Sequence, residues 1–302
     1  MPFMDVAITG SSGLIGSALG RSLTAAGHRI VRVVRPSSSD TTGETITWDP
    51  VAGTIDTAAL EGIDAVVNLA GEGIGERRWS PEQKQRILDS RVRGTDLIAT
   101  AIAKLDRPPA VFLSGSAIGY YGDTGSDTVE ESRPAGTDFL ASVCVEWEAA
   151  TAPAADAGIR TALLRTGIVL DATGGALGKQ LTFFKLGLGG RSGSGRQYWS
   201  WITLADQVAA IEFLLTAEVA GPVNLTAPNP VTNAEFAKTL GHVLGRPTTV
   251  IPMIGPRLLL GRELADSLLL TSQRVVPSIL EQAGFAFSEP TLEPALRSVT
   301  GR

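Results

Sequence analysis

The sequence predicts an α/β fold in which a doubly wound parallel sheet carries helices on both faces. Three observations predict it. A short apolar strand over residues 5–9 passes through a glycine-rich turn into a helix over 17–26. Further short apolar runs alternate with helical segments as far as residue 170. The 302 residues, 43% of them hydrophobic, also suffice for one large α/β domain or for one domain with a smaller appendage.

The first turn has a glycine spacing typical of dinucleotide-binding loops. Gly10 permits a tight turn, Gly13 lets the backbone approach a pyrophosphate, and Gly16 lets the helix pack against the strand. The helix N-terminus then offers unpaired N–H groups to the phosphates. Because the turn lies between a strand and a helix, a nucleotide site is favoured over a purely structural turn. The expected cofactor contacts in this turn are Gly10, Ser11, Ser12, Gly13, Leu14, Ile15 and Gly16.

The end of the second strand bears on the choice between NAD and NADP. This strand covers residues 28–34 and is followed by Arg35. In sites that select NAD, an acidic residue at this point binds the ribose 2′-hydroxyl, and residues 29–39 contain none. A guanidinium is well suited to a 2′-phosphate. The sequence therefore favours NADP over NAD, with an ordinary surface arginine as the alternative interpretation of Arg35.

Two later strands end near the same edge of the predicted sheet. The strand over 64–69 ends in Ala70 and Gly71, where small side chains leave room for a flat cofactor. The strand over 110–113 runs into the segment 114–122, which is rich in hydroxyl groups. In a sheet with a nucleotide site, such a strand end is where chemistry is expected.

A long helix is predicted between these strands, over about 80–104. Arg86, Ser90 and Arg91 lie close to one face of it. These side chains either reach the cofactor or form a solvated, charged face.

The pattern changes towards the C-terminus. A strand over 160–165 is expected to continue through residue 170. The glycine-rich segment 187–195, which contains Arg191, predicts a mobile loop rather than a strand. The aromatic cluster at 198–201 predicts packing or, alternatively, a platform for a substrate.

Composition excludes several classes of function. The net charge is −5 and no block of Lys or Arg occurs, so nucleic-acid binding is not expected. Cys144 is the only cysteine, which excludes an internal disulfide and favours a reducing compartment. The two histidines, His28 and His242, lie in no metal-binding motif, and no apolar run is long enough to span a membrane. We therefore expect a cytoplasmic protein without a metal site.

Several motifs together resemble those of the extended short-chain dehydrogenases/reductases. The glycine turn after Thr9, the strand end at 68–71 and the segment 114–122 carry this resemblance. Further motifs resemble an epimerase-like subgroup with a C-terminal domain of unknown function, some of whose members are labelled nucleoside-diphosphate-sugar epimerases or cell-division inhibitors. These motifs are Arg77-Arg78-Trp79, Ser90-Arg91-Val92-x-Gly94-Thr95, Leu188-Gly189-Gly190, Ser200-Trp201-Ile202, Val223 to Pro228, Gln273 to Pro277 and Ala283-Gly284-Phe285.

The resemblance implies an NAD(P)-binding Rossmann fold with a smaller C-terminal α+β substrate region. On this basis we expect an NADP-binding epimerase/dehydratase domain over 1–230, with 171–230 partly in the substrate region, and a family-specific domain over 231–302. The cofactor contacts expected outside the glycine turn are Arg35, Leu69, Ala70, Gly71, Arg91, Ser114 and Val169. Arg35 is supported both by the resemblance and by the missing acidic residue.

The chain departs from this family at the catalytic pair. Extended reductases use Tyr-x-x-x-Lys, in which the lysine lowers the pKa of the tyrosine that exchanges a proton. Phe139 and Val143 occupy the two corresponding places, and neither side chain can do this. No tyrosine of the chain has a lysine four positions after it. The tyrosines are Tyr120, Tyr121 and Tyr198, followed by Thr124, Gly125 and Ile202.

Three functional hypotheses follow. In the first, the chain is an NADP-dependent oxidoreductase or epimerase with substitute groups. Ser116, or alternatively Ser114, would orient a carbonyl, and Tyr120 or Tyr121 would donate the proton. Glu72 is a further candidate if the fold brings it close.

In the second hypothesis, the chain binds NADP(H) without turnover and acts as a regulatory or partner-binding protein. In the third, it is a nucleotide-sugar epimerase, with Arg191 and Arg196 holding the diphosphate. The expected partner is a small molecule, either a nucleotide-sugar or a carbonyl compound, and a homodimer is an open alternative to a monomer.

Overall fold

A sheet of eight strands forms the centre of the computed structural model, which describes residues 2–38 and 43–302. Ser39, the last residue of the segment 29–39 that contains no acidic side chain, lies outside the described residues. The strand order is β13-β8-β6-β5-β1-β2-β3-β4. The strands are β1 (Asp5–Thr9), β2 (Arg29–Val34), β3 (Glu44–Asp49), β4 (Thr54–Ile55), β5 (Ala65–Asn68), β6 (Val111–Ala117), β8 (Arg160–Thr166) and β13 (Gly221–Leu225).

The sheet is doubly wound, as the sequence predicted. The chain starts at β1 and moves outward through β2 and β3, then returns to β5 and moves outward on the other side. All neighbouring strands are parallel except β4, which pairs with β3 in the antiparallel sense. The direction therefore reverses between β1 and β5, and ligands of such sheets bind at the carboxyl ends of the strands at this point.

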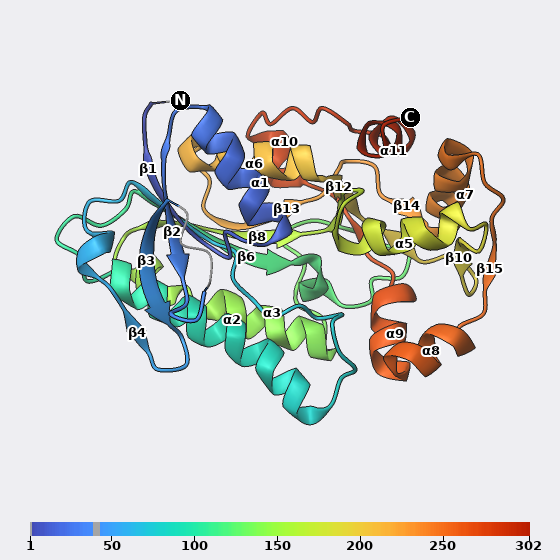
Figure 1. Cartoon of the computed structure of the whole chain (residues 1–302), viewed down its shortest axis with the longest axis horizontal. Coiled ribbons are helices and arrows are strands. Elements are labelled where there is room, and N and C mark those ends of the chain that lie inside the picture. Colours follow the sequence, from blue (N-terminus) through green and yellow to red (C-terminus); the bar gives the residue numbers. More distant parts are fainter. Residues whose placement is uncertain (1, 39–42) are drawn as a thin grey trace.

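Helices cover both faces of the sheet (Figure 1). One face carries α1 (Leu14–Ala25), α6 (Leu204–Thr216) and α10 (Ser278–Gln282), and the other carries α2 (Pro81–Ile102) and α3 (Phe139–Ala149). A short helix, α4 (Ala152–Asp156), follows α3. Ser80 begins α2 because its hydroxyl accepts the N–H of Gln83 and Pro81 needs no intrahelical acceptor.

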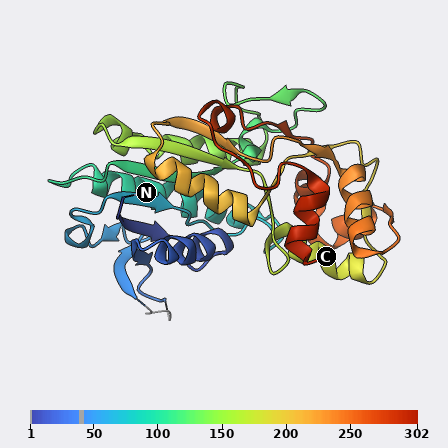
Figure 2. The same ribbon diagram turned by 90° about the horizontal axis from the view of Figure 1, so that it is seen from above.

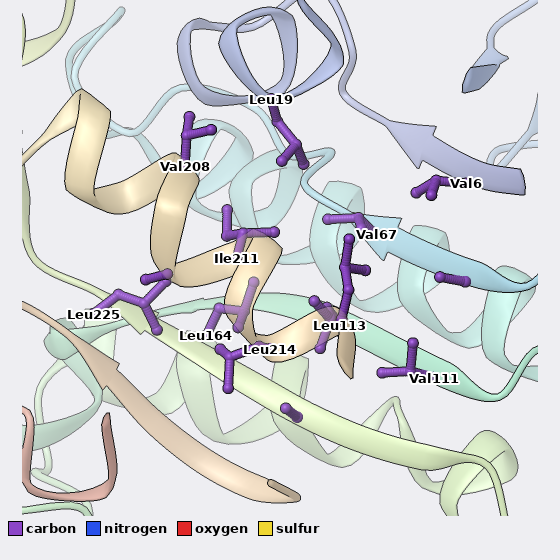
Figure 3. Packing of buried hydrophobic residues seen from close by; sticks show 14 of the residues in the cluster. Val6, Leu19, Val67, Val111, Leu113, Leu164, Val208, Ile211, Leu214 and Leu225 are labelled. Atoms are coloured by element: carbon purple, nitrogen blue, oxygen red, sulfur yellow. The ribbon is translucent and has the colours of Figure 1, made fainter. Parts of the chain in front are cut away.

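The main core lies between the sheet and the pair α1 and α6 (Figure 3). Leu19 of α1 and Ile211 and Leu214 of α6 face the apolar side chains of the strands, which include Val67 and Leu113. These side chains are fully buried. This packing holds β1 and β5 side by side, so the turn after β1 is built on a rigid base.

The strand predicted over 160–170 is two strands, which corrects that expectation. β8 ends at Thr166, and β9 (Ile168–Leu170) leaves the sheet and pairs with β12 (Trp201–Thr203). The break is at Gly167, where an added Cβ would lie 2.7 Å from the carbonyl oxygen of Ser200. The chain can leave the sheet here because glycine allows that close approach.

The loop predicted over 187–195 contains a strand, which also corrects the expectation. β10 (Gly190–Ser192) pairs in parallel with β15 (Thr249–Ile251). An added Cβ at Gly190 would collide with the carbonyl group of Thr249, so the glycine serves close strand pairing rather than mobility.

The C-terminal elements gather at one end of the sheet (Figure 2). They share a separate core that includes Trp201, Phe236 and Leu296. Thr232 and Glu235 form the predicted capping box at the start of α7. The helices there are α5 (Gly175–Lys185), α7 (Asn233–Leu244), α8 (Ile254–Leu260), α9 (Arg262–Leu269) and α11 (Leu292–Thr300). The short elements are η1 (Ala58–Leu60), η2 (Ile118–Tyr121), β7 (Thr128–Val129) paired with β16 (Arg274–Val275), and β11 (Tyr198–Trp199) paired with β14 (Val231–Thr232).

Candidate functional site

The glycine turn is closely packed against the end of β5. Gly10 has φ +64°, and an added Cβ there would lie 2.8 Å from the carbonyl carbon of Leu69. At Gly16 an added Cβ would collide with the carbonyl oxygen of Gly10. Gly13 donates its N–H to that same oxygen at 3.0 Å and precedes the first residue of α1. An added Cβ would meet backbone atoms at Gly10 and Gly16, and the N-terminus of α1 faces the turn with its unpaired N–H groups.

Thr9 joins the ends of β1 and β5. Its hydroxyl donates to Asn68 Oδ1 at 2.7 Å and accepts the N–H groups of Leu69 and Ala70 at 3.0 and 3.1 Å. Asn68 Nδ2 in turn donates to the hydroxyl of Ser114 at 3.3 Å. Thr9, Asn68 and Ser114 are buried, and these bonds bring Leu69, Ala70 and Ser114, all predicted cofactor contacts, close to the glycine turn.

Two arginines lie at the end of β2 nearest the turn. Arg35 follows the strand and is exposed, as a residue that meets a phosphate from solution should be. Arg32, within β2, donates from Nε to the hydroxyl of Ser11 at 3.2 Å. Sequence reasoning missed Arg32, although an arginine inside an apolar strand beside a glycine turn is a usable signal.

Val169 and Leu14 lie on the opposite side of the turn. An added Cβ at Gly175 would be 3.3 Å from Leu14 Cδ2 and 3.5 Å from the carbonyl oxygen of Val169. The glycines that begin α5 therefore let β9 and the start of α1 approach each other. Two predicted contacts that are far apart in sequence lie close together here.

Arg91 extends from α2 to the segment after β5. An added Cβ at Gly71 would lie 3.2 Å from its Cζ, and its Nη1 donates to the carbonyl oxygen of Glu72 at 2.9 Å. The guanidinium carbon lies 5.0 Å from the ring centre of Trp147. Burial lowers the pKa of Arg91 from its ordinary value, because the charged form loses solvation. Arg91 has no carboxylate partner among the described residues.

A cavity of about 240 Å³ adjoins Arg91. It lies between η2, α3, the end of β8 and the segment 267–273. Its walls include three aromatic rings, and Val143, one of the two residues in place of the catalytic pair, also lines it. The lining residues are Ile74, Arg91, Ala117, Ile118, Gly119, Asp138, Leu140, Val143, Cys144, Trp147, Thr166, Gly167, Ile168, Tyr198, Trp199, Ser200, Ser267, Leu268, Thr271 and Gln273.

The sequence-predicted catalytic hydroxyls lie in a buried network behind this cavity. Ser116 donates to Glu148 Oε1 at 2.6 Å, and Glu148 holds Arg165 through two bonds of 2.8 Å. Arg165 also donates to the hydroxyl of Tyr121 at 3.0 Å, and Tyr121 donates to Asn224 Oδ1 at 2.7 Å. Burial raises the pKa of Tyr121 to about 12. These bonds stabilise the network and leave the two hydroxyls engaged within the protein.

Tyr120 lies beside that network. The guanidinium carbon of Arg165 is 3.4 Å from its ring centre, and its ring packs edge-on against Tyr121. Neither Ser116 nor the two adjacent tyrosines belong to the described lining of the cavity. Tyr198, for which sequence reasoning weighed packing against a substrate platform, does line it.

The two positions that replace the catalytic pair have different surroundings. Phe139 packs edge-on against Trp79, with ring centres 4.9 Å apart, and Lys84 Nζ lies 4.9 Å from its centre. Val143 is buried against the cavity. The neighbouring thiol of Cys144 is kept protonated, since burial raises its pKa to about 11. The helix thus presents apolar or neutral groups where proton transfer would be expected.

The remaining candidates lie outside the cavity. Glu72 Oε1 accepts from Gln83 Nε2 at 2.8 Å and lies 3.5 Å from Arg86 Nε. Arg191 donates to the carbonyl group of Ser194, and Arg196 lines a second, open hollow of about 550 Å³. Within residues 2–38 and 43–302, no group of three or more potential ligands could hold a metal ion. The helices of the same residues include none that is both apolar and long enough to cross a bilayer.

Comparisons with known proteins give a consistent result. The profile of the NAD dependent epimerase/dehydratase family matches residues 6–226, and that of a domain of unknown function (DUF1731) matches residues 251–299. Epimerase family protein Mb2239 of Mycobacterium bovis is 48% identical over 299 residues, which are 98% of each chain.

Two solved structures are similar over nearly the whole chain. The crystal structure of human epimerase family protein SDR39U1 (isoform 2) with NADPH has a TM-score of 0.90 and 36% identity, and the match covers 99% of this chain and 100% of that one. The structure of a nucleoside-diphosphate sugar epimerase from Corynebacterium glutamicum has a TM-score of 0.81 and 36% identity, with 99% of this chain and 58% of that one covered.

Proposed function

This chain belongs to the NAD-dependent epimerase/dehydratase family, and we propose that it is an NADP(H)-dependent oxidoreductase acting on a small molecule. The cofactor would lie across the carboxyl ends of β1 and β5, with its pyrophosphate at the glycine turn. The observation that carries this proposal is the crowding at Gly10 and Gly16, where a Cβ would meet backbone atoms. The N–H of Gly13 is bonded to Gly10, and the N–H groups of the first turn of α1, which have no intrahelical acceptor, would bind the phosphate.

The preference for NADP over NAD rests on the basic end of β2. Arg35 is exposed beside the glycine turn, and Arg32 is bonded to Ser11 within it. A guanidinium binds a 2′-phosphate through charge-assisted hydrogen bonds. The human relative at 36% identity was crystallised with NADPH, which supports the same choice.

The substrate would occupy the cavity beside Arg91, with the C-terminal region 231–302 supplying its outer wall. NADPH supplies a hydride to a carbonyl carbon, and the carbonyl oxygen takes up a proton to give the alcohol and NADP⁺. All three tyrosines of the chain are described, and Tyr198 is the one that lines the cavity. We therefore assign the proton donation to Tyr198 in preference to Tyr120 and Tyr121.

Titration of NADPH and NADH tests the cofactor assignment. Wild type should bind NADPH more tightly, and Arg35→Ala should lose roughly tenfold in NADPH affinity while its NADH affinity is unchanged, because a charge-assisted bond to the 2′-phosphate is removed. Arg297→Ala, at an exposed ion pair on α11, is the matched control. Equal affinities of wild type for the two cofactors would contradict the proposal.

Oxidation of NADPH in the presence of small carbonyl compounds tests the activity. Sustained turnover supports an enzyme. Intact NADPH binding without turnover across the panel would favour the regulatory hypothesis instead.

A further inference from the structure

The walls of the cavity are mainly apolar and aromatic. The rings of Trp147, Trp199 and Tyr198 line it together with the aliphatic side chains of Leu140 and Leu268. Flat apolar ligands gain most from such walls, because they bury area against rings without desolvating charge. The surroundings therefore favour a substrate with a cyclic, apolar body.

Each of the two charged side chains in the described lining makes at least one hydrogen bond within the protein. Arg91 donates from Nη1 to the carbonyl oxygens of Glu72 and Ile87 and lies over the ring of Trp147. Asp138 accepts the N–H of Ala141 at 2.9 Å and so caps α3. A diphosphate would require several cations facing it, and the described lining contains one.

The cavity is also small. Pockets for drug-sized ligands measure about 300–1,000 Å³, whereas this one measures about 240 Å³. A nucleotide-sugar carries a base, two sugars and a diphosphate. The cavity by itself holds a compact molecule, whereas a nucleotide-sugar would have to extend beyond it.

The C-terminal region contacts the segments around the cavity through Gln273, Glu263 and the end of α8. Gln273 donates to the carbonyl oxygens of Ile118 and Gly122 at 2.9 and 3.2 Å. Lys84 forms an ion pair with Glu263 at 2.5 Å. Arg78 donates to the carbonyl groups that end α8. The contacts of Lys84 and Arg78 hold α8 and α9 against the start of α2 and the segment before it, whereas Gln273 lies in the cavity wall.

We propose that the cavity binds a small, uncharged carbonyl compound with an aromatic or cyclic body, and that nucleotide-sugars are not its substrates. This inference rests on the proposed NADP(H) function. The family's domain of unknown function then supplies, through residues 267–273, the wall that limits substrate size and charge.

Calorimetric titration of the NADP⁺ complex tests the inference. The probes are 1-naphthaldehyde and UDP-glucose, and no hydride can be transferred from the oxidised cofactor to the aldehyde. Leu268→Trp should fill the cavity and weaken 1-naphthaldehyde binding by at least roughly tenfold. Leu259→Trp, on the exposed surface of α8, is the matched control and should bind as wild type does.

The affinity for NADP⁺ is measured first, in a separate titration. Its absence in wild type would contradict the proposed function itself. With NADP⁺ bound, tighter binding of UDP-glucose than of 1-naphthaldehyde, or unchanged aldehyde binding by Leu268→Trp, would overturn only the substrate class. If Leu268→Trp does not fold, Val143→Trp fills the same cavity from α3 and is read in the same way.

Discussion

The proposed cofactor side of the site is formed mainly by backbone, and the proposed substrate side mainly by side chains. The cofactor side consists of backbone: a turn whose glycines touch carbonyl groups, and strand ends joined by Thr9. The proposed substrate side consists of residues from seven separate segments, which meet around a cavity. Backbone geometry constrains which residues are allowed, whereas a side-chain cavity can be lined in many ways. The glycine turn on the cofactor side can therefore be recognised in the sequence, whereas the lining of the cavity cannot.

The largest expected effect is a loss of stability. It tests whether the buried network behind the cavity is structural and not part of the binding site. Glu148→Ala should lower the free energy of unfolding by about 3–5 kcal/mol, because it leaves the Arg165 charge buried without its partner. The two side chains are only 4% and 9% exposed. Urea unfolding measures the change, and Glu146→Ala, at an exposed position on the same helix, is the control. A loss of ligand binding without a loss of stability would instead place the network in the site.

The next largest expected effect is on kcat, and it distinguishes Tyr198 from Tyr121 as the proton donor. Tyr198→Phe should lower kcat by roughly 100-fold, within the usual contribution of a positioned proton donor, and leave NADPH affinity unchanged. Tyr121→Phe should leave kcat within roughly threefold of wild type, because its hydroxyl is bonded to Arg165 and Asn224. Steady-state kinetics with a carbonyl substrate compare the two variants. The opposite ranking would assign proton donation to Tyr121, in the segment after β6.

A substitution in the glycine turn tests whether its close backbone packing is required for stability and cofactor binding. Gly16→Ala should cost about 1–3 kcal/mol in unfolding free energy, since the new Cβ meets the carbonyl group of Gly10. It should also weaken NADPH binding at least roughly tenfold, because the turn must shift. Gly20→Ala on the same helix has no atom within 4 Å of the new Cβ, and should be neutral or stabilising. Similar results for both variants would remove the argument from close packing.

The smallest expected effect is a pH dependence. The pKa of Tyr121 is raised to about 12 by burial, so the folded state holds the proton where the unfolded state releases it. The stabilisation is complete below about pH 10 and is lost between about pH 10 and 12. From pH 9 to pH 11, wild type should lose about 1.4 kcal/mol more than Tyr121→Phe. Equal losses in urea unfolding would show that this hydroxyl titrates normally.

The sequence predicted the sheet and the tight glycine turn well, because both depend on local patterns. The turn at 10–16, the strand ends and the capping box at Thr232 each depend on neighbours within a few residues. Prediction from the sequence was less successful for residues whose contacts lie far away along the chain. The break at Gly167 and the strand at Gly190 depend on Ser200 and Thr249, which no local pattern reveals.

By itself, the amino-acid sequence determined the doubly wound sheet, the glycine turn and the loss of the Tyr-x-x-x-Lys pair. Periodicity, glycine spacing and residue identity are properties of short segments. Only the tertiary structure decided which tyrosine reaches the cavity and how small and apolar that cavity is. Those features arise where η2, α3 and the C-terminal region pack together, and close packing joins residues that no sequence spacing relates.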